Sequence, residues 1–99
     1  VRHYLTGMIR SIRHKALRAY WTEGRTKGLN AEWLTRLAVI LDALDSAVSP
    51  EDMDIPGLRF HRLKGEMAGR YSVRLTGNWR ITFAWSEQDA TDIDIEDYH

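Results

Sequence analysis

The first half of the chain has the spacing of apolar residues that is typical of helices. In "HKALRAYWTEG", apolar side chains recur at helical intervals, and Gly24 is a suitable point for the helix to stop. Asn30 then has the character of an N-cap for a second helical segment, "AEWLTRLAVILDALDSA". This second segment carries one broad apolar stripe that we expect to face a hydrophobic core. The stripe comprises Trp33, Leu34, Leu37, Ile40, Leu41 and Leu44.

The second half alternates apolar and polar residues with the period of two that is typical of strands. The segments "GRYSVRLTG", "NWRITFAW" and "ATDIDIEDY" follow this pattern, and Gly77-Asn78 between the first two is a hairpin signal. Short strands are also indicated at "MIRSI" and within "LRFHRLKG", whereas "VSPEDMDIPGL" has the composition of a loop. Helices followed by a meander of strands predict an α+β fold, in which two helices cover one face of a mainly antiparallel sheet.

The length of 99 residues suits one compact domain with an ordinary globular composition. Residues 1–7 match no periodic pattern, so we expect a single functional domain over residues 8–99, preceded by an extension or a cloning remnant. The sequence has neither the apolar run of roughly 20 residues that a membrane span requires nor a signal-peptide core. We therefore expect a cytoplasmic protein with no membrane partner.

Residue types and spacings argue against a metal site. The chain contains no cysteine, which excludes disulfides, thiolate nucleophiles and Cys-based zinc sites. The four histidines, His3, His14, His61 and His99, show no metal-ligand spacing. The segment "DATDIDIED" places acids close together, but it lacks the glycine of a calcium loop, and alternation directs these side chains along a strand. We expect neither a metal nor a cofactor.

Positive and negative charges are separated along the chain, although the formal net charge is zero. All fourteen Lys and Arg residues lie at or before Arg80, whereas residues 87–97 contain six acids and no base. One interpretation is a set of ion pairs across a sheet, which bulk charge alone favours. The other is a cationic groove beside a few acid–base groups. Six bases are concentrated in the central stretch: Arg59, Arg62, Lys64, Arg70, Arg74 and Arg80.

Several polar residues of the second half are candidates for chemistry. His61 lies in "FHRLKG", three residues before Lys64, although a lone histidine in a strand is more often structural than catalytic. Arg80 in "NWRITF" either pairs with a neighbouring acid or holds a phosphate through its two-pronged guanidinium. The terminal residues 97–99 are either a frayed polar tail or a group of proton-handling side chains that the last strand delivers to the basic face.

In combination, these segments resemble a known family of bacterial toxins. The series "MIRSIRHKALRAYW", "FHRLKG", "YSVRLTGNWRITF" and a terminal "DYH" is similar to the HigB branch of the RelE/ParE-type toxins, and the resemblance covers residues 8–99. It implies a RelE-like α+β fold, with two N-terminal helices packed on a mainly antiparallel twisted sheet. It also implies a ribosome-dependent endonuclease that cuts mRNA in the ribosomal A site without a metal.

The resemblance implies a catalytic set of four residues. In this reaction the ribose 2′-hydroxyl attacks the adjacent phosphate and the 5′-oxygen leaves, which requires a base, an acid and cations. His61 and His99 would be the acid–base candidates, with the assignment between them open. Asp97 would orient an imidazole or share the proton transfer. Tyr98 would stack on the substrate or form a hydrogen bond with it.

Four further residues would bind the substrate by the same resemblance. Lys64 and Arg80 would hold the scissile phosphate, with Arg80 the stronger candidate. Asn78 would read a base or shape the hairpin turn, and Arg74 would bind a backbone phosphate. These eight residues are the candidate site that the sequence predicts.

The resemblance also implies partners. A cognate antitoxin, HigA-like and with a helix-turn-helix, would neutralise the toxin, and operator DNA would be bound only through the complex. Ribosome and mRNA would be the targets. Two other functions stay open: a non-catalytic toxin that binds DNA gyrase, and an inactive module that serves only as antitoxin partner and co-repressor. The presence of His61 and of the terminal Asp-Tyr-His favours cleavage.

Overall fold

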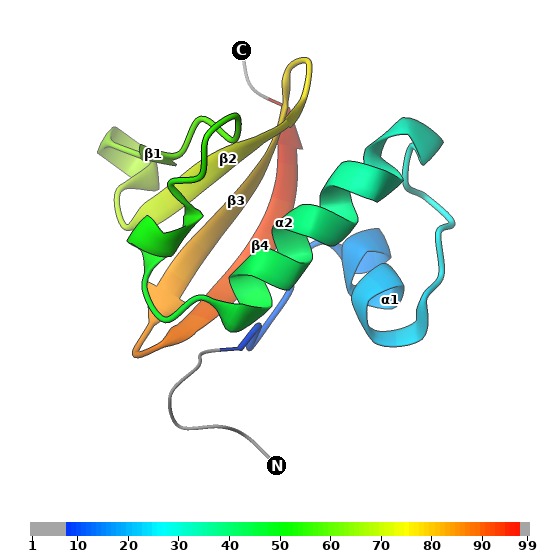
Figure 1. Ribbon diagram of the computed structural model, residues 1–99, viewed down its shortest axis with the longest axis horizontal. Coiled ribbons are helices and arrows are strands. Elements are labelled where there is room, and N and C mark those ends of the chain that lie inside the picture. The colour runs from blue at the N-terminus through cyan, green and yellow to red at the C-terminus, as the bar shows by residue number, and fades with distance from the viewer. Residues whose placement is uncertain (1–7, 98–99) are drawn as a thin grey trace.

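The computed structural model describes residues 8–97, which form two α-helices and one four-stranded sheet (Figure 1). Residues 1–7 and the terminal Tyr98 and His99 lie outside the described residues. The helices and strands are α1 (Lys15–Glu23), α2 (Leu34–Ser46), β1 (His61–Arg62), β2 (Arg70–Thr76), β3 (Trp79–Ser86) and β4 (Asp89–Asp97). Short 3-10 helices are η1 (Ala31–Trp33), η2 (Pro50–Met53) and η3 (Gly65–Met67).

Side chains at both ends of the helical segments explain where these helices begin and end. His14 caps α1 because its Nδ1 accepts a hydrogen bond from the Leu17 amide at 3.1 Å. Gly24 ends α1 in the left-handed region, with φ of 73°, which glycine adopts without strain. The expected N-cap at Asn30 is confirmed, since its Oδ1 accepts from the Glu32 amide at 2.9 Å. The first turn of that segment is η1, and α2 follows it directly.

The strands form a sheet of order β1-β2-β3-β4 in which every neighbouring pair is antiparallel. This confirms the α+β fold, and the turn at Gly77-Asn78 between β2 and β3 confirms the expected hairpin. The short strand expected within "LRFHRLKG" is confirmed, and it consists of His61 and Arg62, which pair with β2. Arg59 just before it has φ of 51°, which interrupts the extended backbone.

The expected strand at "MIRSI" forms only two isolated parallel bridges to β4, Ile9 with Ala90 and Ile12 with Ile93. Between these two contacts β4 is irregular: Asp92 has φ of 49°, and the β3–β4 register shifts there. A continuous ladder is therefore interrupted, and residues 9–12 lie along the β4 edge of the sheet. No helix among residues 8–97 is both long enough and apolar enough to span a membrane.

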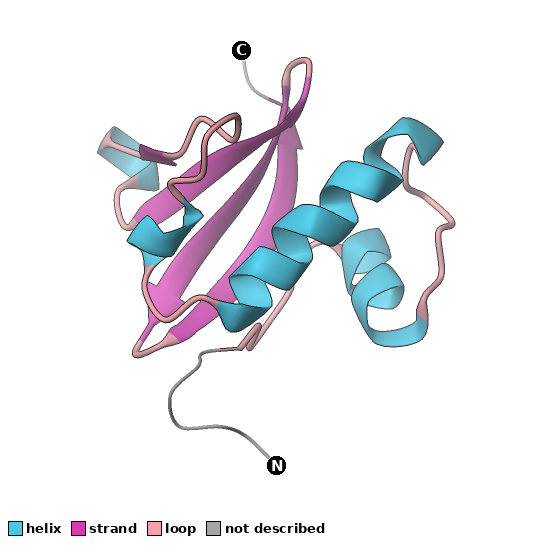
Figure 2. Ribbon diagram, in the orientation of Figure 1, coloured by secondary structure: helices cyan, strands magenta, loops and turns pink. Residues whose placement is uncertain are grey.

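Helix α2 lies across one face of the sheet, with α1 on the β4 side of it (Figures 1 and 2). The expected apolar stripe of α2 is buried, apart from the half-buried Leu34, and the alternating apolar residues of the strands meet it in one core. Leu17 of α1 belongs to the same core. The completely buried members are Leu17, Leu37, Ile40, Leu41, Leu44, Met53, Val73, Ile81, Phe83, Ala90 and Ile93. The opposite face of the sheet is left for polar side chains.

Candidate active site

The register of the strands gathers polar side chains on the sheet face that α2 does not cover. Arg80 on β3 is the cross-strand partner of Arg74 on β2 and of Glu96 on β4. Further along β3, on the same face, Thr82 is the cross-strand partner of Ser72 on β2. Cross-strand partners direct their side chains to the same face of a sheet, so the alternation of apolar and polar residues produces a polar row across three strands.

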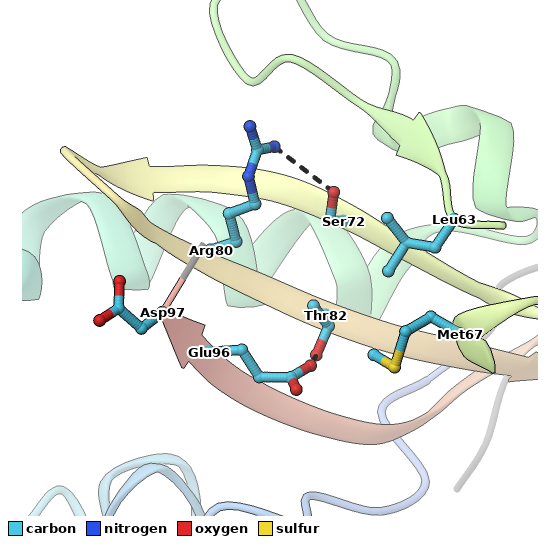
Figure 3. Close-up of a pocket in the computed structure, with 7 residues that line it drawn as sticks. All are labelled: Leu63, Met67, Ser72, Arg80, Thr82, Glu96 and Asp97. Atoms are coloured by element: carbon cyan, nitrogen blue, oxygen red, sulfur yellow. Dashed lines mark hydrogen bonds between the residues drawn. The ribbon is translucent and has the colours of Figure 1, made fainter. Parts of the chain in front are cut away.

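A pocket of about 260 Å³ opens on this row (Figure 3). Ser72 and Thr82 are only 1% and 3% exposed, although both are polar residues on the outer face. Leu63 and Met67, from the connection between β1 and β2, form its apolar side and point over the strands in Figure 3. The residues that line this pocket are Leu63, Met67, Ser72, Arg80, Thr82, Glu96 and Asp97.

A second pocket of about 180 Å³ adjoins the first and shares Leu63, Ser72 and Arg80 with it. Its remaining lining residues are His61, Arg62 and Lys64. The structure thus brings the predicted His61, Lys64 and Arg80 to one pocket, and Asp97 with Arg80 to the next. Arg80 lies between the two, and its Nη1 donates a hydrogen bond to the Ser72 hydroxyl at 3.5 Å (Figure 3).

Two predicted substrate-binding residues lie apart from these pockets. Arg74 lines a separate pocket of about 330 Å³ together with Glu32 and Arg36, although it is the cross-strand partner of Arg80. Asn78 is exposed in the β2–β3 turn and lines neither of the two pockets around Arg80. The predicted Tyr98 and His99 lie outside the described residues, and they follow Asp97 directly in the sequence.

The sequence interpretation missed a chain of hydrogen bonds beneath the first pocket. Arg70 Nη2 donates to the Thr82 hydroxyl at 2.9 Å and to the Asp92 carbonyl at 2.8 Å. The Thr82 hydroxyl donates in turn to the Glu96 carboxylate. The sequence did contain a signal for these residues. Ser72, Thr82 and Glu96 occupy the alternate strand positions that place side chains on the same sheet face as Arg74 and Arg80. Hydroxyl and acidic residues on an outer sheet face are too common to single out without the pocket that covers them.

The pKa of Arg70 is lowered overall, although its surroundings act on it in both directions. Burial lowers its pKa first of all, and the nearby Arg13 lowers it further. The carboxylates of Glu96, Asp94 and Asp92 act in the opposite direction and favour the cationic form. Arg70 is therefore a partly buried guanidinium that donates to Thr82, one of the residues that line the pocket.

A surface ion pair ties β1 to η2. Arg62 Nη2 contacts the Glu51 carboxylate at 2.5 Å, and its guanidinium also lies 5.7 Å from the centre of the Phe60 ring. The hydrogen bond from Arg62 is the largest influence that lowers the pKa of Glu51. The pair therefore links the two-residue strand that carries His61 to η2 at the surface.

The arrangement suits chemistry on a phosphate. Arg80 and Lys64 supply cations, His61 supplies an imidazole, and Asp97 supplies a carboxylate. Within residues 8–97, His, Asp and Glu side chains form no group of three or more that would hold a metal ion. Cationic, imidazole and carboxylate side chains are the types that bind anions and transfer protons in catalysis.

Comparison with known proteins identifies the family of this chain. Residues 10–99 match the family described as RelE-like toxin of type II toxin-antitoxin system HigB. A curated relative, Endoribonuclease HigB from Proteus vulgaris, is 36% identical over 92 residues, which cover 93% of this chain and 100% of the relative. The chain therefore belongs to the HigB-like family of RelE-like toxins from type II toxin–antitoxin systems.

Proposed function

We propose that this toxin is an endoribonuclease that cuts mRNA in the A site of the ribosome. The observation that carries the proposal is the position of Arg80, whose side chain is shared by a pocket with His61 and Lys64 and a pocket with Asp97. A phosphate at Arg80 would be within reach of groups from both pockets. The name of the Proteus vulgaris relative, Endoribonuclease HigB, supports the same activity.

The proposed reaction is an attack within the RNA chain itself. A base removes the proton of the ribose 2′-hydroxyl, and the resulting oxygen forms a bond to the adjacent phosphorus. The bond from phosphorus to the 5′-oxygen breaks, and an acid gives that oxygen a proton. The products are a 2′,3′-cyclic phosphate and a free 5′-hydroxyl. DNA lacks the nucleophile, so it would not be cut.

The residues of the candidate site would divide these tasks by their chemistry. Arg80 and Lys64 would hold the phosphate and stabilise the charge that develops on its oxygens. His61 would be one of the two proton-transfer groups, with His99 as the other. Asp97 would orient an imidazole, and Tyr98 would contact the substrate. The roles of residues 98–99 rest on their place in the sequence after Asp97.

The two outlying residues have supporting roles in the proposal. Arg74 shares its pocket with Arg36, so it would hold a backbone phosphate away from the reacting one. Asn78 is exposed at the end of the β2–β3 hairpin, where its amide would read a base or only shape the turn.

A second basic surface supports binding to the ribosome. A shallow pocket of about 520 Å³ on α1 and the segment after it is lined by His14, Lys15, Ala16, Ala19, Arg25 and Lys27. Basic residues gathered on one surface are the electrostatic footprint of RNA binding. The formal net charge of zero means that such binding must come from a local surface rather than from bulk attraction.

Membership in a type II toxin–antitoxin family implies a cognate antitoxin. We propose that this partner is HigA-like, with a helix-turn-helix, and that operator DNA is bound only through the complex. The site of action would be the cytoplasm, where ribosomes are. We also propose that the toxin domain spans residues 8–99. In support, the Met8 amide donates to the Asp89 carboxylate at 3.1 Å, which ties the beginning of this span to β4.

The test is primer extension on an mRNA in a purified translation system, with and without ribosomes. Wild-type toxin is expected to cut within codons only when ribosomes are present. His61→Ala and His99→Ala should each weaken cutting by about 10²-fold or more, as expected for loss of an acid–base group. A message with 2′-deoxy sugars at the main cut site should stay intact there. Intact mRNA under all conditions would contradict the proposal and direct attention to gyrase inhibition.

A further inference from the structure

The pocket between Leu63, Met67 and Glu96 has features that phosphate chemistry does not require. We propose that it binds the nucleobase beside the scissile phosphate, and that Glu96 favours bases with an exocyclic amino group over uracil. The inference rests on the proposed function, because it identifies which part of an RNA substrate this pocket takes. It assigns a specificity-determining role to Glu96, a residue that the sequence interpretation did not single out.

The shape and lining of the pocket suit a flat heterocycle. Leu63 and Met67 provide one apolar side, and Figure 3 shows both pointing toward the strip of sheet that carries Ser72 and Thr82. A thioether side chain is flexible and polarisable, so it adapts to an aromatic ring. An apolar wall facing a few fixed polar groups is the usual composition of a small-ligand pocket. Proteins that recognise single-stranded RNA take unstacked bases into such pockets.

The carboxylate of Glu96 is held in place before any substrate arrives. Its Oε2 accepts from the Thr82 hydroxyl, and Thr82 accepts in turn from Arg70 at 2.9 Å. Arg70 is itself fixed by its bond to the Asp92 carbonyl. Among residues 8–97, Oε1 of Glu96 has no hydrogen-bond partner, so one oriented acceptor is available at the pocket.

An oriented carboxylate oxygen discriminates between bases. Carboxylates only accept hydrogen bonds, and the amino groups of adenine, cytosine and guanine donate them. Uracil has carbonyl oxygens where adenine or cytosine has an amino group, and these repel a carboxylate. The proximity of Arg80 places such a base next to the phosphate, because Arg80 lines the same pocket as Glu96 and is its cross-strand partner.

A titration with nucleoside 5′-monophosphates tests the pocket directly. Isotope-labelled toxin would be titrated with AMP, CMP, GMP and UMP, and the NMR signals of Leu63, Met67 and Thr82 followed. The three amino-bearing nucleotides should shift these signals, with UMP binding about tenfold more weakly, which corresponds to one hydrogen bond to a charged group. Glu96→Gln should reduce this difference to about twofold, because an amide both donates and accepts.

Asp94→Asn is the matched control, since Asp94 lies on the same strand, loses the same charge and does not line the pocket. It should leave the nucleotide preference unchanged. UMP binding as tightly as the other three, or shifts confined to other parts of the protein, would overturn the inference. So would an equal loss of preference in both variants, which would point to net charge instead of a contact.

Cleavage profiles separate failure of this inference from failure of the proposed function. Wild-type, Glu96→Gln and Asp94→Asn toxins would be compared on mRNAs that differ only in the base at each codon position. Glu96→Gln should increase cutting at uracil relative to the other bases by about tenfold at one codon position. If wild-type toxin cuts with the same base preference as Glu96→Gln, the inference is wrong and the nuclease stands. If the wild type cuts no mRNA at all, the proposed function itself fails.

Discussion

Arg80 and Ser72 are joined across the β2–β3 pair, with Nη1 of the arginine 3.5 Å from the serine hydroxyl. Both residues line both pockets of the candidate active site, so this pair forms part of the wall that the pockets share, together with Leu63. The guanidinium is thereby directed toward β2, and Arg80 lines both the pocket that contains His61 and the pocket that contains Asp97. A single arginine in this position can hold one phosphate within reach of groups on both sides.

Arg80→Ala is expected to lower mRNA cleavage by about 10²–10³-fold, the usual cost of removing one group that stabilises transition-state charge. Arg80→Lys should recover only part of this loss, because an ammonium does not reproduce the two-pronged geometry of a guanidinium. Cleavage rates from single-turnover experiments on ribosome-bound mRNA provide the measurement.

Arg59→Ala is the control for this comparison, because Arg59 belongs to the same basic stretch of sequence but lines neither pocket around Arg80. It should cut mRNA within a few-fold of wild type. If Arg59→Ala and Arg80→Ala are equally impaired, general basic charge rather than a located phosphate contact would explain the loss. Thermal melting of each variant would show that the fold is kept.

The ion pair between Glu51 and Arg62 should contribute to stability in a pH-dependent way. Arg62 lowers the pKa of Glu51 from its ordinary value of 4.5, so the folded state favours the carboxylate. The contribution is present above pH 4.5 and is lost as the pH falls through the lower pKa of the folded state. Glu51→Gln should therefore melt at a lower temperature than wild type at neutral pH, with the difference shrinking in acid.

Because both side chains of this pair are largely exposed, the difference at neutral pH should be small and should fall with added salt. Melting curves at several pH values, each with and without added salt, are sufficient. A difference between wild type and Glu51→Gln that stays constant down to acid pH would show that the substitution acts through something other than this ion pair.

Asp89 is expected to be the anchor of the segment that precedes α1. Its buried carboxylate accepts from the Met8 amide at 3.1 Å and from Arg10 Nη2 at 2.6 Å. Asp89→Asn leaves these donors with one acceptor oxygen and should cost about 1–3 kcal/mol in the free energy of unfolding. Urea denaturation measures this change. Asp92→Asn is the control, since this exposed residue at φ of 49° has a conformation that asparagine tolerates.

The control should change stability by less than about 0.5 kcal/mol, as for other exposed positions. If both substitutions have the same effect, the buried carboxylate does not hold the segment. A large effect of Asp89→Asn would also agree with a domain that includes Met8, because the Met8 amide donates to this carboxylate.

Periodicity predicted the elements that depend on local pattern, and it failed where distant parts of the chain decide the outcome. The stripe of α2 and the alternation of β2 and β3 were sufficient to place Arg80 on the outer face. The segment "MIRSI" has the alternation of a strand, yet the irregularity at Asp92 restricts it to two bridges.

The pocket that Glu96 lines could not be predicted from the local sequence pattern either. Its carboxylate gains a role only because Leu63 and Met67, some thirty residues earlier in the sequence, fold over the same strip of sheet. No local sequence pattern indicates that Leu63 and Met67 lie over these strands. His61 and Lys64 were predicted from a resemblance of segments, and the structure places them in one pocket with Arg80.

The basic surface on α1 should contribute to ribosome binding without taking part in cleavage chemistry. Lys15→Ala/Lys27→Ala removes two cations from its lining, whereas Val39→Glu/Val48→Glu adds two acids at exposed positions on α2 and after it. Each double substitution lowers the formal net charge from zero by two units, so the two variants have the same net charge. Only the first pair should weaken binding to ribosomes, because only it removes cations that would face RNA phosphates.

The measurement is the affinity of each double variant and of wild type for ribosomes at several salt concentrations. The plot of log affinity against log salt should become shallower for Lys15→Ala/Lys27→Ala, by about 0.7–0.9 for each RNA phosphate that the variant no longer neutralises. The plot for Val39→Glu/Val48→Glu should stay close to that of wild type. Equal weakening in both pairs would assign the effect to net charge. Unchanged binding in the first pair would show that α1 does not face RNA, and ribosome binding would then depend on the strand face that carries Arg80.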